Sequence, residues 1–103
     1  MTTNTKKIST KIQEHMLNSF DNKDCLINEL NHYKKEFGFN FGKTMVEYGC
    51  FDIYHCDVHE TLKDVLDQSE EEASKYSEQK QWELYQHLIN REANNILTNK
   101  CYI

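Results

Sequence analysis

The sequence has no proline, only three glycines and no apolar run long enough to cross a bilayer. Sandwiches and barrels of many short strands need frequent tight turns, so this scarcity of proline and glycine argues against both. A membrane-spanning helix needs about 20 mostly apolar residues. The first ten residues, MTTNTKKIST, carry lysines with no apolar stretch behind them, which is unlike a signal peptide. We therefore expect a helical, cytoplasmic protein that does not contact a membrane.

The length allows one domain, covering residues 1–103, with one core and an expected radius of gyration of about 13 Å. Aromatic residues make up 12% of the chain, so this core can be rich in aromatic side chains. Four cysteines in a cytoplasmic chain are expected to be free thiols rather than a disulfide framework. They are Cys25, Cys50, Cys56 and Cys101.

Apolar residues at helical spacing predict helices over about residues 5–20, 24–38 and 78–97. In each segment these residues recur three or four positions apart, which places them on one helix face. The tail TNKCYI after the last helix is expected to fray.

Residue types at the ends of these segments predict the helix caps. Asp24 is expected to cap the start of the second helix and Gly38 to end it in a left-handed conformation. Ser77 is expected to cap the last helix. Ser69 and Glu72 form a capping box, which predicts a short helix that ends near residue 76.

The centre of the chain, residues 42–66, allows two interpretations. One line of apolar residues recurs every four positions: Val46, Cys50, Tyr54, Val58, Leu62 and Leu66. That spacing predicts one helix over about residues 44–67. Alternation of apolar and polar residues over the first half also fits a short hairpin near residues 45–55, followed by a helix. We favour the single helix.

These elements together predict an all-α protein, a compact bundle of four to five helices. The alternative is an α+β fold that contains the short hairpin. Eight residues are expected to meet in one core: Leu30, Tyr33, Phe37, Tyr54, Leu62, Trp82, Tyr85 and Ile89.

A short aromatic connection, Phe39-Asn40-Phe41-Gly42, joins the second helix to the centre. Two aromatic residues in so short a loop are either tucked against the core or form an exposed docking patch. Phe39 and Phe41 are therefore candidate partner-binding residues.

Possible catalytic and metal-binding motifs are incomplete. His55 and His59 are four residues apart and Asp52 lies one turn earlier, which is a possible metal site. The glutamate that a zinc protease carries after its first histidine is replaced by Cys56. A nucleophilic Cys50 or Cys56 would need a distant histidine, and so short a chain offers little room for a substrate pocket. We therefore predict no catalytic residues, no bound metal and no cofactor.

Negative charge is concentrated in one quarter of the chain. Residues 47–72 hold nine acidic residues and one basic residue, a net charge of −8, whereas the whole chain carries −5. Five of the acidic residues step by three or four, so on a helix they form one ridge: Asp57, Glu60, Asp64, Asp67 and Glu71. Carboxylates about 5–6 Å apart approximate the spacing of successive phosphates on a nucleic-acid strand. The ridge is therefore a candidate mimic of nucleic acid, and we expect no direct binding to DNA.

Several stretches resemble small proteins encoded by phages and plasmids of low-GC Gram-positive bacteria. They are KEFGF, GKTMVEYGC, DIYHCDV and WELY, and the resemblance extends over about residues 35–97. Several such proteins are anti-CRISPRs that act on type II-A Cas9 nucleases. The resemblance implies a non-enzymatic inhibitor in the bacterial cytoplasm, which binds Cas9 with or without its guide RNA. It transfers no catalytic residue to this chain.

The sequence thus predicts a protein-binding inhibitor encoded by a mobile genetic element, which blocks nucleic-acid loading or binding through its acidic ridge. The alternatives are a metal-bearing or DNA-binding accessory protein of a phage or plasmid, and a small enzyme with a reactive cysteine. A homo-oligomer is compatible with each of them.

Overall fold

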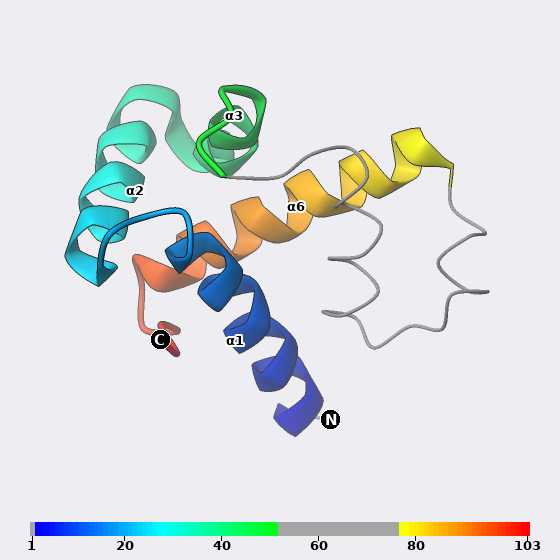
Figure 1. Ribbon diagram of the computed structural model, residues 1–103, viewed down its shortest axis with the longest axis horizontal. Helices are drawn as coiled ribbons and strands as arrows, with labels where there is room; N and C mark the ends of the chain where they lie inside the picture. Colours follow the sequence, from blue (N-terminus) through cyan, green and yellow to red (C-terminus); the bar gives the residue numbers. More distant parts are fainter. Residues whose placement is uncertain (1, 52–76) are drawn as a thin grey trace.

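Four α-helices and one short 3₁₀ helix make up most of the chain that the computed structural model describes, residues 2–51 and 77–103 (Figure 1). In chain order they are α1 (Thr2–Leu17), α2 (Lys23–Phe37), η1 (Gly38–Asn40), α3 (Phe41–Glu47) and α6 (Glu78–Ile96). No strand occurs in these two ranges. The all-α prediction is confirmed for this part of the chain, whereas the total of four to five helices stays a prediction for the whole.

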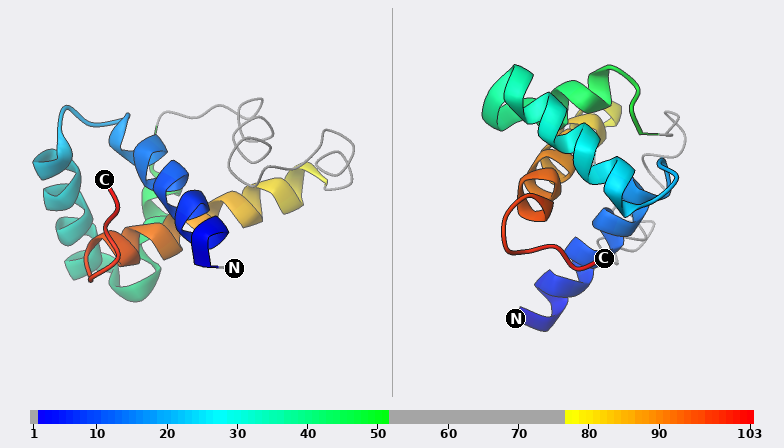
Figure 2. Two further views of the ribbon diagram at one scale, coloured as in Figure 1. Left: turned by 90° about the horizontal axis from the view of Figure 1, so that it is seen from below. Right: turned by 90° about the vertical axis from the view of Figure 1, so that its left-hand side faces the viewer.

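The longest of these helices, α6, is the one on which the others assemble. Both α1 and α3 pack against α6, and α2 packs against α3. Figures 1 and 2 show α3 on one side of α6, with α1 and the C-terminal tail on another. The radius of gyration is 13.3 Å, which agrees with the value expected from the length.

The core lies where these four helices meet. Of the eight predicted core residues, Leu30, Tyr85 and Ile89 are buried. Tyr33 and Trp82 are partly buried and pack against the core. Phe37 is 42% exposed, so its prediction as a core residue is wrong. The remaining two, at positions 54 and 62, lie outside the described residues.

Two of the three predicted helix caps that lie within the described residues are confirmed. The Ser77 side chain accepts a hydrogen bond from Lys80 N, and Gly38 ends α2 with a φ of 75°. Asn22, rather than Asp24, caps the start of α2, because its side chain accepts from Cys25 N at 2.9 Å. Asp24 lies in the first turn, where a carboxylate interacts favourably with the helix dipole. The predicted capping box at positions 69 and 72 lies outside the described residues.

The central segment does not form the continuous helix predicted over residues 44–67, because α3 ends at Glu47. Gly49 adopts a φ of 74° and donates its N–H to Val46 O, while Cys50 N donates to Met45 O, both at 3.0 Å. This pair of bonds is a Schellman motif, which satisfies the last carbonyl groups of a helix and turns the chain away. The hairpin alternative is also wrong at its start, since positions 45–47 are helical. Residues 52–67 lie outside the described part.

Close packing of α3 on α6 depends on Gly42. A Cβ atom at this position would lie 2.5 Å from Asn90 Cα, and the Gly42 N–H donates to Asn90 Oδ1 at 2.9 Å. A side-chain rotamer change cannot relieve a clash with a backbone atom. Only glycine at position 42 therefore allows α3 to approach α6 so closely.

We predict that Gly42→Ala separates α3 from α6 and lowers the free energy of unfolding by about 1–3 kcal/mol, as overpacking does in other cores. Chemical denaturation measures this change. Glu47→Ala, at an exposed position of the same helix, is the control and should cost less than about 0.5 kcal/mol. Equal stability of Gly42→Ala and the wild type would show that the two helices are not in such close contact.

The C-terminal tail is held in place, so the expectation that it frays is wrong. Gln13, fully buried on α1, accepts from Tyr102 N at 2.8 Å and donates to Lys100 O at 2.9 Å. Lys23 Nζ donates to Ile103 O at 2.7 Å. The tail therefore closes the end of the core between α1 and α2.

Among the described residues no helix combines the length and the hydropathy of a membrane span.

Candidate protein-binding surface

Three aromatic side chains from α2 and the end of α3 form a cluster on the surface of the protein, which we call the aromatic surface. Its members are Tyr33, Phe37 and Tyr48. The Tyr33 and Phe37 rings are stacked with centroids 5.7 Å apart, and Tyr48 meets them edge-on at 6.2 and 5.8 Å. Each ring therefore contacts both of the others, so the three form one continuous group.

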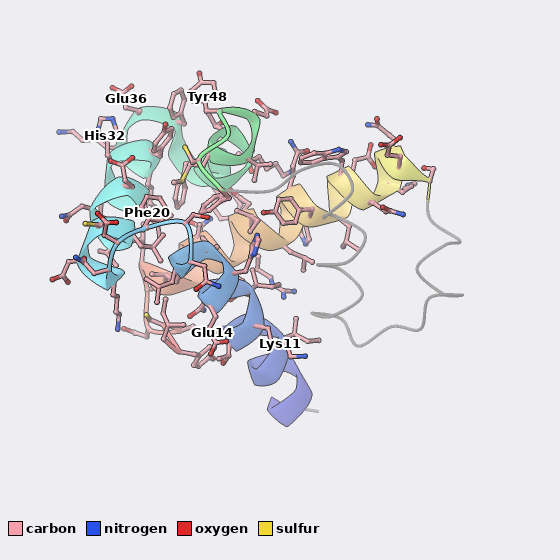
Figure 3. All side chains as sticks on the ribbon, in the orientation of Figure 1. Lys11, Glu14, Phe20, His32, Glu36 and Tyr48 are labelled. Carbon is pink, nitrogen blue, oxygen red and sulfur yellow. The ribbon has the colours of Figure 1, made fainter. Side chains whose placement is uncertain are left out.

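The aromatic surface is open to solvent. Phe37 is 42% exposed and Tyr48 is 62% exposed, whereas Tyr33 is partly buried beneath them. The polar His32 meets Tyr33 edge-on at 5.7 Å, and Figure 3 labels His32 and Glu36 on α2, the helix against which Tyr48 packs. An apolar centre with polar residues at its edge has the composition of a protein-binding site.

Local structure explains why these rings meet. Tyr33 and Phe37 are four residues apart on α2, so they lie on the same face of that helix. The turn at Gly49 places Tyr48 at the C-terminal end of α3 and directs Cys50 back toward α2, where its thiol and the Tyr33 hydroxyl form a hydrogen bond of 3.3 Å. The interaction with Cys50, assisted by partial burial, raises the pKa of Tyr33 to about 12. Tyr33 thus keeps its proton well above neutral pH.

The two aromatic residues that the sequence singled out have different environments. Phe39 is 73% exposed, as a partner-binding residue must be, and this contradicts the interpretation that it is tucked against the core. Phe41 is fully buried, so its prediction as a partner-binding residue is wrong. The reason is that α3 begins at Phe41, which places this ring on the same helix face as Met45, against the core.

The other predicted sites lie outside the described residues. This holds for the whole acidic ridge, Asp57, Glu60, Asp64, Asp67 and Glu71, and for the possible metal ligands Asp52, His55 and His59. Within residues 2–51 and 77–103 no group of three or more potential ligands could hold a metal ion. The Cys50 thiol is one of the two candidate nucleophiles. It is hydrogen-bonded to the Tyr33 hydroxyl rather than to a histidine.

A buried carboxylate that the sequence analysis missed connects α1 with α6. Glu92 is fully buried, and each of its carboxylate oxygens accepts two hydrogen bonds. Ser9 Oγ and Arg91 Nε donate to Oε2 at 2.9 and 3.0 Å. Gln13 Nε2 and Asn95 Nδ2 donate to Oε1 at 3.0 and 3.1 Å. Four donors satisfy this group completely, so its role is to join the two helices and the tail rather than to catalyse a reaction.

Spacing along each helix contained the signal for this cluster. Glu92 lies three residues after Ile89 and four before Ile96, within the apolar stripe of α6. Ser9 and Gln13 likewise share the buried face of α1 with Met16. A polar residue inside an apolar stripe destabilises the protein unless its side chain is hydrogen-bonded. Three such residues on two helices therefore indicate a buried polar network.

A second polar contact joins the same helices at a titratable residue. His15 Nε2 lies 2.8 Å from the Tyr85 hydroxyl, and the two rings meet edge-on at 5.8 Å. Burial lowers the pKa of His15 and raises that of Tyr85. At neutral pH the imidazole is therefore uncharged and the phenol keeps its proton, which lets Tyr85 donate to Nε2.

We predict that this contact makes the protein less stable in weak acid. The folded protein binds the His15 proton less readily than the unfolded chain, whose histidines titrate near pH 6.5. The contribution of neutral His15 to the free energy of unfolding is complete above that pH. It is lost as the pH falls toward the pKa of His15 in the folded protein. The free energy of unfolding between pH 7 and pH 5 should thus fall more in the wild type than in His15→Gln. His32→Gln, at an exposed histidine, is the matched control and should behave as the wild type. Parallel curves for wild type and His15→Gln would show that the folded protein does not keep His15 neutral.

The chain matches no known protein family, no curated protein and no solved structure. Its function must therefore be inferred from its own surfaces.

Proposed function

We propose that this chain is a non-enzymatic protein that binds and inhibits a larger protein, and that the aromatic surface is part of its binding site. The observation that carries this proposal is the exposure of two large rings, Phe37 and Tyr48, in mutual contact. Single exposed apolar residues are common on any protein, whereas a contiguous group is a feature of interaction sites. Tyrosine and phenylalanine are also enriched in the centres of protein interfaces.

Ring contacts within the aromatic surface favour tight binding. The hydrogen bond with Cys50 restricts the Tyr33 side chain, and the Tyr33 ring packs against both exposed rings. A partner that covers these rings restricts side chains that already have few accessible conformations. The entropy lost on binding is correspondingly small, and more of the buried area contributes to affinity.

The proposed target is a type II-A Cas9 nuclease, with or without guide RNA. We propose this target because residues 35–97 resemble anti-CRISPR proteins. The net charge of −8 over residues 47–72 supports a partner with a basic surface, as any protein that holds nucleic acid must have. In this proposal the acidic ridge occupies a groove for nucleic acid, and the aromatic surface provides the apolar part of the same interface. The inhibitor acts in the cytoplasm as a single domain of four to five helices, and it requires no metal or cofactor.

Inhibition of DNA cleavage tests this function. Purified protein is added to Cas9 before the guide RNA, after the guide RNA, or after the target DNA, and the cleaved fraction is measured. We expect inhibition that saturates near one inhibitor per nuclease and that weakens as salt rises, because the acidic residues act on basic groups. An uninhibited nuclease in all three orders of addition would show that Cas9 is not the target.

The contribution of the acidic ridge is tested separately by a triple exchange, Asp57→Asn, Glu60→Gln and Asp64→Asn. It should raise the inhibitor concentration needed for half-inhibition by about tenfold or more, because several charge pairs are lost together. Exchange of Glu70 and Glu72 for Gln is the matched control, since these residues are predicted at a helix start rather than on the ridge. Equal inhibition by the triple variant and the wild type at every salt concentration would exclude the mimicry of nucleic acid.

A further inference from the structure

A cleft of about 340 Å³ lies between η1, the start of α3 and the C-terminal half of α6. Eight residues line it: Phe39, Asn40, Lys43, His87, Asn90, Arg91, Asn94 and Asn95. This volume is within the range of small-ligand sites. The cleft is separate from the aromatic surface defined above, since the two share no residue.

The lining of the cleft differs in charge from the protein as a whole. It contains one lysine, one arginine and one histidine, and none of its eight residues is acidic, although the chain carries a net charge of −5. Arg91 forms an ion pair with the buried Glu92, whose Oε2 accepts from Arg91 Nε at 3.0 Å. This bond uses one edge of the guanidinium group and orients it, while the side chain stays 41% exposed. Lys43 therefore provides positive charge on one wall of the cleft, and Arg91, whose charge Glu92 offsets, provides its remaining N–H donors on the other.

An aromatic ring stands at the edge of the same cleft. Phe39 is 73% exposed, more than any other large apolar residue described. Its backbone is fixed, because Asn94 Nδ2 donates to Phe39 O at 3.1 Å and to Asn90 O at 2.9 Å. These two bonds use the amide nitrogen of Asn94, a residue that also lines the cleft.

The two walls are joined rigidly, so the cleft exists before any ligand binds. Gly42 brings α3 against α6 so closely that even a methyl group would collide with the Asn90 backbone. The hydrogen bond from Gly42 N to Asn90 Oδ1 adds a second connection at the same point. A site formed in advance loses less entropy on binding than one that must be ordered by its ligand.

We propose that this cleft binds a nucleotide unit, with the base stacked on Phe39 and the phosphate held by Lys43 and Arg91. Exposed aromatic rings beside basic side chains are the usual means of binding unpaired nucleotides, because every base has a face that can stack. A guanidinium group and an ammonium group both bind phosphate, and side-chain amides can bond to the edges of a base. The general acidity of the chain opposes binding of a long duplex, whereas this local site can accept one unpaired nucleotide. The source is a free nucleotide or one residue of a single strand, and the proposal does not depend on the function proposed above.

The test measures fluorescence anisotropy of a labelled single-stranded RNA of about ten nucleotides, a length that covers one such site. Unlabelled AMP and inorganic phosphate serve as competitors. We expect binding that weakens as salt rises, and displacement of the label by unlabelled RNA, with or without displacement by AMP, at concentrations where phosphate has no effect. If AMP displaces the RNA at a comparable concentration, the ligand is the free nucleotide; if only unlabelled RNA displaces it, the ligand is a single strand. No binding of RNA or AMP would overturn the proposal, and so would competition by phosphate as strong as that by AMP.

Variants locate the binding in the cleft. Phe39→Ser should weaken it about fivefold or more, and Lys43→Gln should weaken it and reduce its dependence on salt. Lys80→Gln, which removes the same charge from the exposed first turn of α6, is the matched control and should bind as the wild type does. Lys43→Arg should retain binding, which separates loss of charge from loss of fold. Unchanged affinity in both Phe39→Ser and Lys43→Gln would show that the nucleotide binds elsewhere.

Discussion

Replacement of Glu92 by alanine is expected to lower the free energy of unfolding by about 3–5 kcal/mol, the largest effect of any single substitution considered. The carboxylate accepts four hydrogen bonds inside the protein, from Ser9, Gln13, Arg91 and Asn95. Without it Ser9 and Asn95 lose this acceptor, Gln13 Nε2 keeps only its bond to Lys100 O, and a cavity separates α1 from α6. A melting temperature lower by about 15–25 °C is the measurable result for a domain of this size.

A comparison of two further variants shows whether the hydrogen bonds or the charge matter. Glu92→Gln keeps one oxygen for Gln13 and Asn95 but places an NH₂ group opposite Arg91 Nε, so its cost should lie between those of wild type and Glu92→Ala. Glu83→Ala, at an exposed position of the same helix, should change stability by less than about 0.5 kcal/mol. If Glu92→Ala were no less stable than Glu83→Ala, the carboxylate would not be buried as the structure has it.

Truncation of Leu30 is expected to cost about 2–5 kcal/mol, the usual range for a fully buried leucine. Its side chain has no exposed surface and lies within the core formed by α1, α2, α3 and α6. Leu30→Ala removes apolar contacts and leaves a cavity that the surrounding helices can fill only in part. Chemical denaturation of the variant measures the cost.

The control for Leu30→Ala lies on the same helix. Ile27 is only partly buried, so Ile27→Ala should destabilise the protein by clearly less. A cost below about 1 kcal/mol for Leu30→Ala, or a larger cost for Ile27→Ala, would mean that α2 presents a different face to the core.

Helical spacing in the sequence was sufficient to predict α1, α2 and α6, because each carries an apolar stripe on an otherwise polar helix. It was not sufficient at residues 48–50. There the apolar line through Val46 and Cys50 continues at helical spacing, yet Gly49 ends the helix by adopting a positive φ. Glycine at the position after a helix is a strong stop signal, and here it outweighs the periodicity of the neighbouring residues.

The environments of individual side chains were harder to predict, because they depend on residues distant in sequence. Phe39 and Phe41 are two positions apart, so in helical structure they point in nearly opposite directions, one outward and one into the core. Which of them is buried depends on the position of α6, which comes much later in the chain. Glu92 is buried only because donors from α1 reach it, one of them 83 positions away. Local patterns carry no information on such pairings.

The aromatic surface illustrates the same difference. The pairing of Tyr33 with Phe37 follows from their spacing on one helix. Their exposure does not, since it depends on where α3 ends and on how Tyr48 returns toward α2. A sequence pattern suited to a core thus forms a surface, and this surface carries the proposed function.

The affinity of the double variant Phe37→Ser, Tyr48→Ser for the Cas9–guide RNA complex, measured by interferometry beside the wild type, tests this account most directly. An interface aromatic often contributes 2 kcal/mol or more, and a loss of about 2 kcal/mol for the pair already corresponds to about 30-fold, so we expect affinity to fall about 30-fold or more while the melting temperature changes little. Tyr102→Ser, which alters an exposed aromatic residue of the C-terminal tail on the other side of α6, is the matched control and should bind as the wild type (Figure 1). Wild-type affinity in the folded double variant would contradict the claim that the aromatic surface binds the partner.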